Sequence, residues 1–458
     1  MTRAMHFRLA IRSLVALAVV SMAAGAASAE WKENVLYSFQ GGPTDGALPV
    51  GKMVFDSKGN LYGATTQGGG ECPPAQCGAV FELTPPAKNG DPWTETVLHI
   101  FKGIYNGNPL DGNVPAGGIV IDGAGNLYGT TGYGGTGSCV LSGTKVGCGT
   151  VYELSPPTRQ GGTWTETVLY SFQSGKDGYL PWGDLIFDAK GNLYGATEYG
   201  GGYGSCNSPY YQYCGTVFEV SPSKKNGGAW TEKVLYSFKS GMDGANPNGG
   251  LIFDAKRTIY GTTQFGGNDS GDCGSGGCGT VFDLKPPTKK NGAWSERVLY
   301  RFKSGPDASE PVAGLVSGGG GSVYGTTLGG GNSGLGAVFQ LKRGSGSAWI
   351  EKVLYRFSDG SDGANPMGPL TFAANGSLYG TALGGGTHRG VVFHLNPPKR
   401  GNPWSLSVLY NLKGSPDGDH PTTGLTLDKK GDLYSTTQWG GTGQSCQGGC
   451  GTVFETRP

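Results

Sequence analysis

Residues 185–197 read Leu-Ile-Phe-Asp-Ala-Lys-Gly-Asn-Leu-Tyr-Gly-Ala-Thr, and related versions of this stretch occur seven times in the chain. The tyrosine recurs at intervals of 66, 66, 66, 64, 55 and 55 residues, at Tyr62, Tyr128, Tyr194, Tyr260, Tyr324, Tyr379 and Tyr434. Two short apolar segments joined by Asp-x-x-Gly-Asn are typical of two strands connected by a hairpin turn. Self-similarity of this kind is the signature of a repeat architecture.

Two further segments recur in step with the tyrosine, and both have the composition of strands. One reads Val-Leu-Tyr-x-Phe and the other Gly-Thr-Val-Phe-Glu. In the fourth repeat the four expected strands are Leu251–Asp254, Ile259–Thr263, Gly279–Leu284 and Val298–Phe302. Four antiparallel strands repeated seven times predict an all-β protein, a seven-bladed β-propeller of four-stranded blades. A β-helix or linear solenoid is the alternative, but solenoid repeats are usually shorter.

The two ends of the chain predict how the ring closes. Residues 31–39 form a strand of the fourth type, and the chain stops after a strand of the third type, residues 451–455. We therefore expect the N-terminal strand to complete the last blade. The blades are expected at about 41–102, 103–172, 173–238, 239–302, 303–357, 358–412, and 413–458 plus 30–40. A tryptophan precedes each fourth strand, and packing between blades is its expected role; these are Trp31, Trp93, Trp164, Trp230, Trp294, Trp349 and Trp404.

The repeat motif resembles that of the bacterial GloVer tandem-repeat family. The match runs through Gly191-Asn192-Leu193-Tyr194-Gly195, then Gly200-Gly201, then Gly215-Thr216-Val217-Phe218-Glu219, and covers essentially residues 31–458. The motif departs from the pattern in repeat five and in repeat seven, where Ser435 replaces a glycine. The resemblance implies export and a repeat fold. It implies no established activity, so no catalytic residue is carried over.

The N-terminus and the composition indicate the compartment and the class of partner. Arg3, Arg8 and Arg12 precede an apolar stretch, and Ala27-Ser28-Ala29 fits a signal-peptidase site. We expect residues 1–29 to be removed and the mature chain to be secreted or periplasmic, without a membrane span; an uncleaved anchor is the alternative. Only 15 % of residues are charged and the formal net charge is +1, which argues against nucleic acid as a partner.

Ten cysteines fall in pairs between the second and third strands of five repeats. Because each of these repeats has two and the others have none, we expect five local disulfides in an oxidising compartment. Zinc binding is the alternative, but no partner histidines lie nearby. The expected pairs are Cys72–Cys77, Cys139–Cys148, Cys206–Cys214, Cys273–Cys278 and Cys446–Cys450.

An aspartate follows the fourth strand of every repeat, within an Asp-Gly-x-x-Pro signature. Such residues are typical of turns, in which Asp caps the turn, Gly takes a positive φ and Pro sets the exit. A ring of carboxylates near the channel mouth is the functional alternative, which would bind calcium through oxygen ligands. No other cofactor is expected. The aspartates are Asp45, Asp111, Asp177, Asp243, Asp307, Asp362 and Asp417.

Aromatic residues that do not repeat gather in the same loops, mostly in repeat three. Tyrosine and tryptophan suit recognition surfaces, and beside an acid they can stack on sugar rings and hydrogen-bond to hydroxyl groups. Packing within the loops is the alternative. The candidate ligand-binding residues are Tyr133, Tyr179, Trp182, Asp184, Tyr199, Tyr203, Tyr210, Tyr211, Phe265 and Trp439.

Catalytic motifs are absent from the sequence. There is no His-Glu-x-x-His and no Gly-x-Ser-x-Gly, and the few histidines read as ordinary strand and loop residues. We therefore expect a binding or scaffold module, with extracellular carbohydrate as the favoured ligand. A glycan-active hydrolase or lyase is one alternative, because paired carboxylates serve that chemistry. A surface component that binds another protein is the other.

Overall fold

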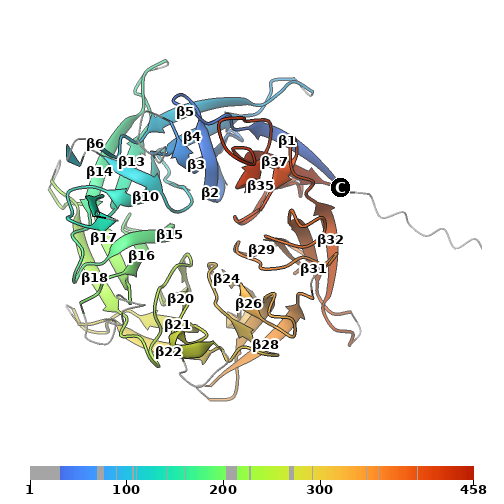
Figure 1. The fold of residues 1–458 in the computed structure, drawn as a ribbon. Helices are drawn as coiled ribbons and strands as arrows, with labels where there is room; N and C mark the ends of the chain where they lie inside the picture. The colour runs from blue at the N-terminus through green and yellow to red at the C-terminus, as the bar shows by residue number, and fades with distance from the viewer. Residues whose placement is uncertain are drawn as a thin grey trace, which may run out of the picture. The chain divides into compact units, whose positions relative to one another are not determined.

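Seven small antiparallel sheets surround a central axis, as blades surround the hub of a propeller (Figure 1). The computed structural model describes residues 31–458 except 70–76, 89, 106–107, 110, 142, 160, 203–213, 226–227, 268–272, 291, 347, 359 and 400. The helical residues in this part are two single turns of 3₁₀ helix, Gly274–Gly276 and Gly319–Gly321. The prediction of an all-β, seven-bladed propeller is confirmed.

Each blade runs from an inner strand at the channel to an outer strand at the rim. In this order, blade 1 consists of β2 (Gly46–Phe55), β3 (Leu61–Gly68), β4 (Ala79–Thr84) and β5 (Thr94–Ile100), and blade 2 of β8 (Gly112–Pro115) with β9 (Val120–Ile121), β10 (Leu127–Gly134), β13 (Thr150–Ser155) and β14 (Thr165–Ser171). Blade 3 consists of β15 (Tyr179–Phe187), β16 (Leu193–Tyr199), β17 (Thr216–Ser221) and β18 (Thr231–Ser237). Blade 4 consists of β19 (Ile252–Phe253), β20 (Ile259–Thr263), β21 (Thr280–Lys285) and β22 (Ser295–Arg301).

The remaining blades follow the same order. The strands of blade 5 are β24 (Val316–Ser317), β25 (Val323–Thr327), β27 (Ala337–Arg343) and β28 (Trp349–Arg356); of blade 6, β29 (Thr371–Phe372), β30 (Leu378–Ala382), β31 (Val391–Asn396) and β32 (Ser405–Asn411); of blade 7, β34 (Thr426–Leu427), β35 (Leu433–Thr437), β37 (Thr452–Arg457) and β1 (Lys32–Ser38). Short pairs lie in the loops: β6 (Ile104–Tyr105) with β7 (Asn108–Pro109), β11 (Val140–Leu141) with β12 (Thr144–Lys145), β23 (Ala308–Ser309) with β26 (Gly329–Gly330), and β33 (Gly418–Asp419) with β36 (Trp439–Gly440).

The N-terminal strand closes the ring. β1 pairs antiparallel with β37, from Lys32 opposite Arg457 to Ser38 opposite Thr452, and so forms the outer strand of blade 7. In Figure 1 these two ends of the chain, blue and red, lie side by side. A ring closed in this way leaves no unfinished sheet at the seam, which protects the strand edges.

The expected strand boundaries differ from the observed ones by one or two residues in several strands and by more in two places. The outer strand of blade 4 begins at Ser295, three residues earlier than predicted, because Ser295 already pairs with Lys285. In blades 1 and 3 the inner strands β2 and β15 extend back through the segment that we had interpreted as a turn. A register shift between Val50 and Val54, and an equivalent one in β15, allows these strands to bend along the channel wall.

A backbone hydrogen bond joins each blade to the next at the channel mouth. Its donor is the residue before the repeated proline, which adopts a left-handed φ of 54° to 58° in all seven blades. Its acceptor is the carbonyl group that precedes the glycine of the third strand in the blade before. The seven bonds are Leu48 to Cys450, Val114 to Cys77, Leu180 to Cys148, Asn246 to Cys214, Glu310 to Cys278, Asn365 to Leu335 and His420 to Arg389, with N···O distances of 2.8–3.1 Å.

Aromatic side chains fill the space between blades. Phe39, which follows β1, lies with its ring centroid 5.1 Å from that of Phe81 in blade 1, and equivalent Phe pairs join further blades. The repeat tryptophans contact the repeat tyrosines of the preceding blade: Trp31 contacts Tyr379, and Trp164 contacts Tyr62. The predicted packing role of these tryptophans is confirmed, and the apolar core lies between neighbouring blades.

A glutamate occupies the same place on six of the seven outer strands. One carboxyl oxygen of each is buried and has no hydrogen-bond partner among the residues that the structure describes. Burial raises the pKa of each carboxyl, for example to about 7 for Glu95 and about 8 for Glu232. After burial, the negative charge of a nearby loop aspartate is the second cause that raises the pKa in five of the six glutamates. In Glu166 the second cause is His99, which lowers the pKa. Leu406 stands at this place in blade 6. The six are Glu33, Glu95, Glu166, Glu232, Glu296 and Glu351.

We predict that Phe39→Ala destabilises the propeller by about 3–5 kcal/mol, the usual cost of removing a fully buried aromatic ring. Phe39 is 0 % exposed and packs across the seam between β1 and blade 1. Urea unfolding of the mature chain measures the change. Ile350→Ala, at a residue that is 60 % exposed, is the control and should be close to neutral. A loss of less than about 1 kcal/mol in the free energy of unfolding of Phe39→Ala would contradict the closure of the ring by β1.

We also predict that the melting temperature falls as the pH rises from about 5 to about 8. The folded-state pKa of the six glutamates lies above the unfolded value, so the folded protein keeps protons there that the unfolded chain has released. The contribution of these glutamates to stability is therefore fully present below their unfolded pKa and is lost as the pH rises through their folded pKa.

Glu95→Gln should raise the melting temperature at pH 8 and leave it nearly unchanged at pH 5. Asp91→Asn, which alters an exposed acid on a loop, is the matched control. Equal effects of Glu95→Gln at both pH values would show that the buried glutamates do not control the pH dependence.

Candidate functional site

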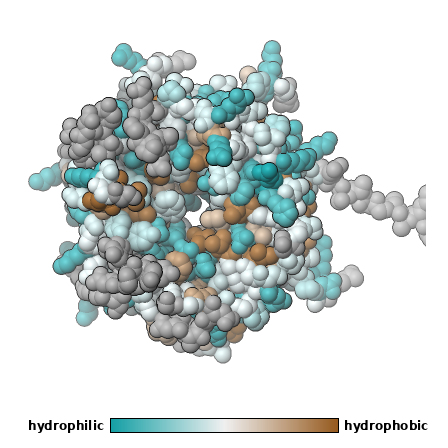
Figure 2. Space-filling view, in the orientation of Figure 1, coloured by the Kyte–Doolittle hydropathy of each residue, from teal (hydrophilic) through white to brown (hydrophobic). Residues whose placement is uncertain are grey.

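A cavity of ≈ 950 Å³ occupies the centre of the ring and is lined by residues from all seven blades. The residue directly after the repeated proline contributes to the wall in every blade: Val50, Ala116, Trp182, Asn248, Val312, Met367 and Thr422. Figure 2 shows hydrophobic residues gathered around the central opening on one face. The volume lies within the range of small-molecule binding sites.

Three aromatic side chains of the cavity come from three different blades. Tyr133 lies on β10 of blade 2, Trp182 on β15 of blade 3 and Trp439 on β36 of blade 7. Side-chain amides stand between them in the wall, those of Gln67, Asn248, Gln264 and Gln438. Asn248 donates to Gln264 Oε1 at 2.8 Å, while its own Oδ1 is buried without a partner in the described part of the chain. Flat apolar faces and hydrogen-bonding groups thus line the same space.

Three of the other predicted aromatic residues, Tyr179, Tyr199 and Phe265, are absent from the wall of this cavity. Tyr179 and Tyr199 stack on each other with centroids 5.3 Å apart, and Phe265 packs against the core between blades 3 and 4. Glu198 and Gln264, which precede Tyr199 and Phe265, line the wall instead. Tyr203, Tyr210 and Tyr211 lie outside the described residues.

Two charged residues of the cavity wall break the repeat. Seven positions after the loop aspartate, four blades have glycine and blade 6 has proline, but blade 1 has Lys52 and blade 3 has Asp184. Asp184 Oδ1 accepts a hydrogen bond from Gly118 N in blade 2 at 2.6 Å. Lys52 Nζ reaches across to Thr371 Oγ1 of blade 6 at 3.5 Å. A side chain at Gly118 would collide with both Asp184 and Lys52, so the glycine makes room for them.

Burial changes the proton affinity of these groups. It raises the pKa of the Asp184 carboxyl, although the Gly118 hydrogen bond and the charge of Lys52 oppose this effect. It lowers the pKa of the Lys52 ammonium, which Asp184 partly restores. Burial also raises the pKa of Glu198, against a hydrogen bond from Tyr199. A cavity with perturbed titratable groups is the usual environment of a functional site.

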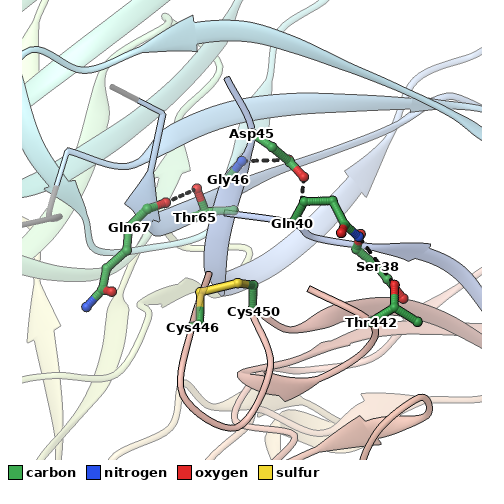
Figure 3. Close-up of a disulfide and its surroundings, with 9 residues drawn as sticks. All are labelled: Ser38, Gln40, Asp45, Gly46, Thr65, Gln67, Thr442, Cys446 and Cys450. Carbon is green, nitrogen blue, oxygen red and sulfur yellow. Dashed lines mark hydrogen bonds between the residues drawn. A yellow bond between two sulfur atoms is a disulfide. The ribbon is translucent and has the colours of Figure 1, made fainter. Parts of the chain in front are cut away.

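The seven loop aspartates are engaged within their own loops. Asp45 Oδ2 accepts hydrogen bonds from Gln40 N at 2.6 Å and from the Tyr37 hydroxyl at 3.1 Å, as the bond from Gln40 in Figure 3 illustrates. The other six make equivalent bonds to the backbone, and His99 takes the place of the tyrosine beside Asp111. Among the described residues, no group of three or more His, Cys, Asp or Glu side chains is arranged to hold a metal ion.

Disulfides close the loops beside these aspartates. The predicted pairs Cys139–Cys148, Cys273–Cys278 and Cys446–Cys450 are confirmed, and Figure 3 shows the last of them next to the Asp45 loop. Cys77 and Cys214 are also disulfide-bonded, and their predicted partners Cys72 and Cys206 lie outside the described residues. In five blades the second cysteine therefore supplies the carbonyl group that accepts the bond from the next blade.

Sequence reasoning missed several residues of the cavity. Lys52, Glu198 and Gln438 were not singled out, and His420 was interpreted as an ordinary loop residue. A signal for three of them was present, because Lys52, Glu198 and His420 differ from their counterparts in the other repeats. Gln438 shares its residue type with Gln264 of blade 4. A search limited to aromatic residues and aspartates passes over lysine, glutamate, histidine and the amides.

Comparison with known proteins supports the family and little more. A structure titled as a putative oxidoreductase (glucose dehydrogenase) from Thermus thermophilus is 17 % identical, covers 75 % of this chain and 96 % of its own, and has a TM-score of 0.42. No curated protein matches the sequence. Among the described residues, no helix is long and apolar enough to cross a membrane.

The repeat pattern named Gloeobacter/Verrucomicrobia repeat matches residues 26–207, 94–320 and 270–458. Together these three matches extend over the whole propeller, from the strand that closes the ring to the last strand of blade 7. The resemblance expected from the motif is confirmed. The chain belongs to the Gloeobacter/Verrucomicrobia repeat family.

Proposed function

We propose that this propeller is a carbohydrate-binding module whose ligand occupies the channel cavity. One observation carries the proposal. The same cavity is lined by Tyr133, Trp182 and Trp439 and by several side-chain amides. Aromatic rings with a polar tip offer an apolar face to a sugar ring, and amides donate to and accept from its hydroxyl groups. None of the three aromatic residues is repeated in all blades, as expected for a site rather than for the scaffold.

The proposal includes a place of action outside the cytoplasm. Residues 1–29 have the composition of a signal peptide, and several disulfides stiffen the loops around the cavity. Structural disulfides of this number persist in oxidising compartments. We infer that the mature chain starts near Glu30 and meets its ligand in the periplasm or outside the cell. N-terminal sequencing of the exported protein tests this inference directly.

We predict that a neutral hexasaccharide raises the melting temperature of the mature, oxidised chain, because a ligand that binds the folded state stabilises it. Cellohexaose, maltohexaose, mannohexaose and xylohexaose are suitable probes, and titration calorimetry gives the affinity. Trp182→Val should weaken binding at least tenfold, about 1.4 kcal/mol. Valine stands at the equivalent position in blades 1 and 5, so the substitution should leave the fold intact.

Tyr179→Ala is the matched control for this experiment. Tyr179 belongs to the same strand as Trp182 but stacks on Tyr199 outside the cavity wall, and alanine stands at its place in blades 1, 4 and 6. Its affinity should equal that of the wild type. Weaker binding in Tyr179→Ala together with unchanged binding in Trp182→Val would show that the site lies outside the cavity. If none of the four hexasaccharides binds, the proposed function is refuted.

The buried acids of the cavity favour one second candidate, a glycan-active enzyme. Asp184 and Glu198 lie in the same wall and both have a raised pKa, which suits a carboxyl group that must donate a proton. If the protein is an enzyme, it will release shorter oligosaccharides from one of the hexasaccharides. Asp184→Asn and Glu198→Gln should then lower turnover at least a hundredfold, the usual contribution of general acid–base catalysis. Binding without any cleavage product after prolonged incubation would exclude this candidate.

A further inference from the structure

Arg389, Asp419 and His420 form a row of hydrogen bonds at the edge of the cavity. Arg389 Nη1 donates to Asp419 Oδ2, and the other carboxylate oxygen, Oδ1, lies 2.5 Å from His420 Nδ1. Asp419 is only 3 % exposed, so its carboxylate is held by these two partners in a buried place. His420 itself lines the cavity, and its side chain is 28 % exposed.

The backbone holds His420 in one position. Its N–H donates to Arg389 O at 2.9 Å, and its carbonyl oxygen accepts from Gln438 N at 3.0 Å. Its ring lies edge-on to Trp439, with the centroids 4.7 Å apart. With Nδ1 turned to Asp419, Nε2 is the ring nitrogen that remains available, and no group in the described part of the chain hydrogen-bonds to it.

This row occurs once in the ring. The two positions before the repeated proline hold Ala47-Leu48, Asn113-Val114, Tyr179-Leu180, Ala245-Asn246, Ser309-Glu310 and Ala364-Asn365 in the other blades. Arg389 likewise stands where five blades have a disulfide cysteine and blade 5 has Leu335. The other six junctions between neighbouring blades form without equivalents of these three side chains. The junction between blades 6 and 7 therefore does not need them for the fold.

We propose that Asp419 and His420 form a dyad in which His420 Nε2 accepts a hydrogen bond from a hydroxyl group of the carbohydrate in the cavity. This inference rests on the proposed carbohydrate-binding function and adds the residue that recognises the hydroxyl group. Trp439 and Gln438, which line the same part of the wall, place an aromatic face and an amide beside that nitrogen. Asp419 and Arg389 are positioning residues that do not touch the ligand.

The chemistry follows from the two nitrogens of a neutral imidazole, of which one donates and the other accepts. A buried carboxylate at Nδ1 accepts the Nδ1–H bond and so fixes the tautomer in which Nε2 carries the free lone pair. An asparagine at position 419 would keep its carbonyl oxygen toward Arg389 and turn its NH₂ group toward Nδ1. The imidazole would then carry its proton on Nε2 and would no longer accept from a hydroxyl group.

The tautomer is measured first, without ligand, by long-range ¹H–¹⁵N correlation on protein labelled at histidine. Four histidines remain after residue 29, and the spectrum of His420→Leu assigns the signal of His420. We expect the Nδ1–H tautomer in the wild type and the Nε2–H tautomer in Asp419→Asn. Leucine stands at this place in blades 1 and 3 and asparagine at the place of Asp419 in blade 2, so both variants should fold.

Binding of the four hexasaccharides named above is measured next. His420→Leu and Asp419→Asn should each weaken binding about 5- to 10-fold, as expected for the loss of one hydrogen bond. His388→Asn, which changes an exposed histidine with a left-handed φ of 66°, is the control and should bind as the wild type does. Asparagine tolerates that conformation.

The outcomes separate the dyad from the proposed function. A wild type that binds a hexasaccharide but carries the Nε2–H tautomer, or a His420→Leu variant that binds equally well, would overturn the dyad alone. A wild type that binds none of the four hexasaccharides would overturn the proposed function and this inference with it.

Discussion

One hydrogen bond, repeated seven times, joins the inner edges of neighbouring blades. The residue before the repeated proline takes a left-handed φ and donates its N–H to the carbonyl group before the third strand of the preceding blade. A left-handed backbone is unfavourable for residues such as Leu48 and Val114, so the surrounding loop must hold it in place. The aspartate of the same loop does this by binding the backbone and an outer-strand tyrosine or histidine. Residues beside this bond line the channel, so the bond also fixes the position of the channel wall.

Because the scaffold is set by repeated residues, the residues that do not repeat are free to make a site. Lys52 and Asp184 stand where the other blades have glycine or proline, and Trp182 stands where the others have smaller side chains. His420 uses the left-handed position itself, so the bond that joins blades 6 and 7 also fixes a side chain of the cavity. The ring thus supplies equivalent places, and substitutions in a few blades give the channel its chemistry.

Much of the architecture could be predicted from the sequence because the repeat is local. The spacing of the tyrosines gave seven blades, and the cysteine pairs lie within single loops. The bond between blades could not be predicted, because nothing in a single repeat marks the pair. In six of the bonds the acceptor lies 30 to 37 residues before its donor, and in the bond from Leu48 it is Cys450, near the other end of the chain. Trp182 and Asp184 were found because they break the repeat. Tyr199 and Phe265 stand at the same place in the repeat as Tyr133 and Trp439, yet they pack outside the cavity wall, a difference that the repeat pattern does not mark.

The most direct test is a crystal structure of the mature, oxidised chain grown with the hexasaccharide that binds it best. The account predicts sugar density inside the channel, against Trp182 and Trp439, with the seven inner-edge hydrogen bonds unchanged. Density at the rim of the ring, or on the loops of blade 3 outside the channel, would contradict a functional site built by the residues that break the repeat.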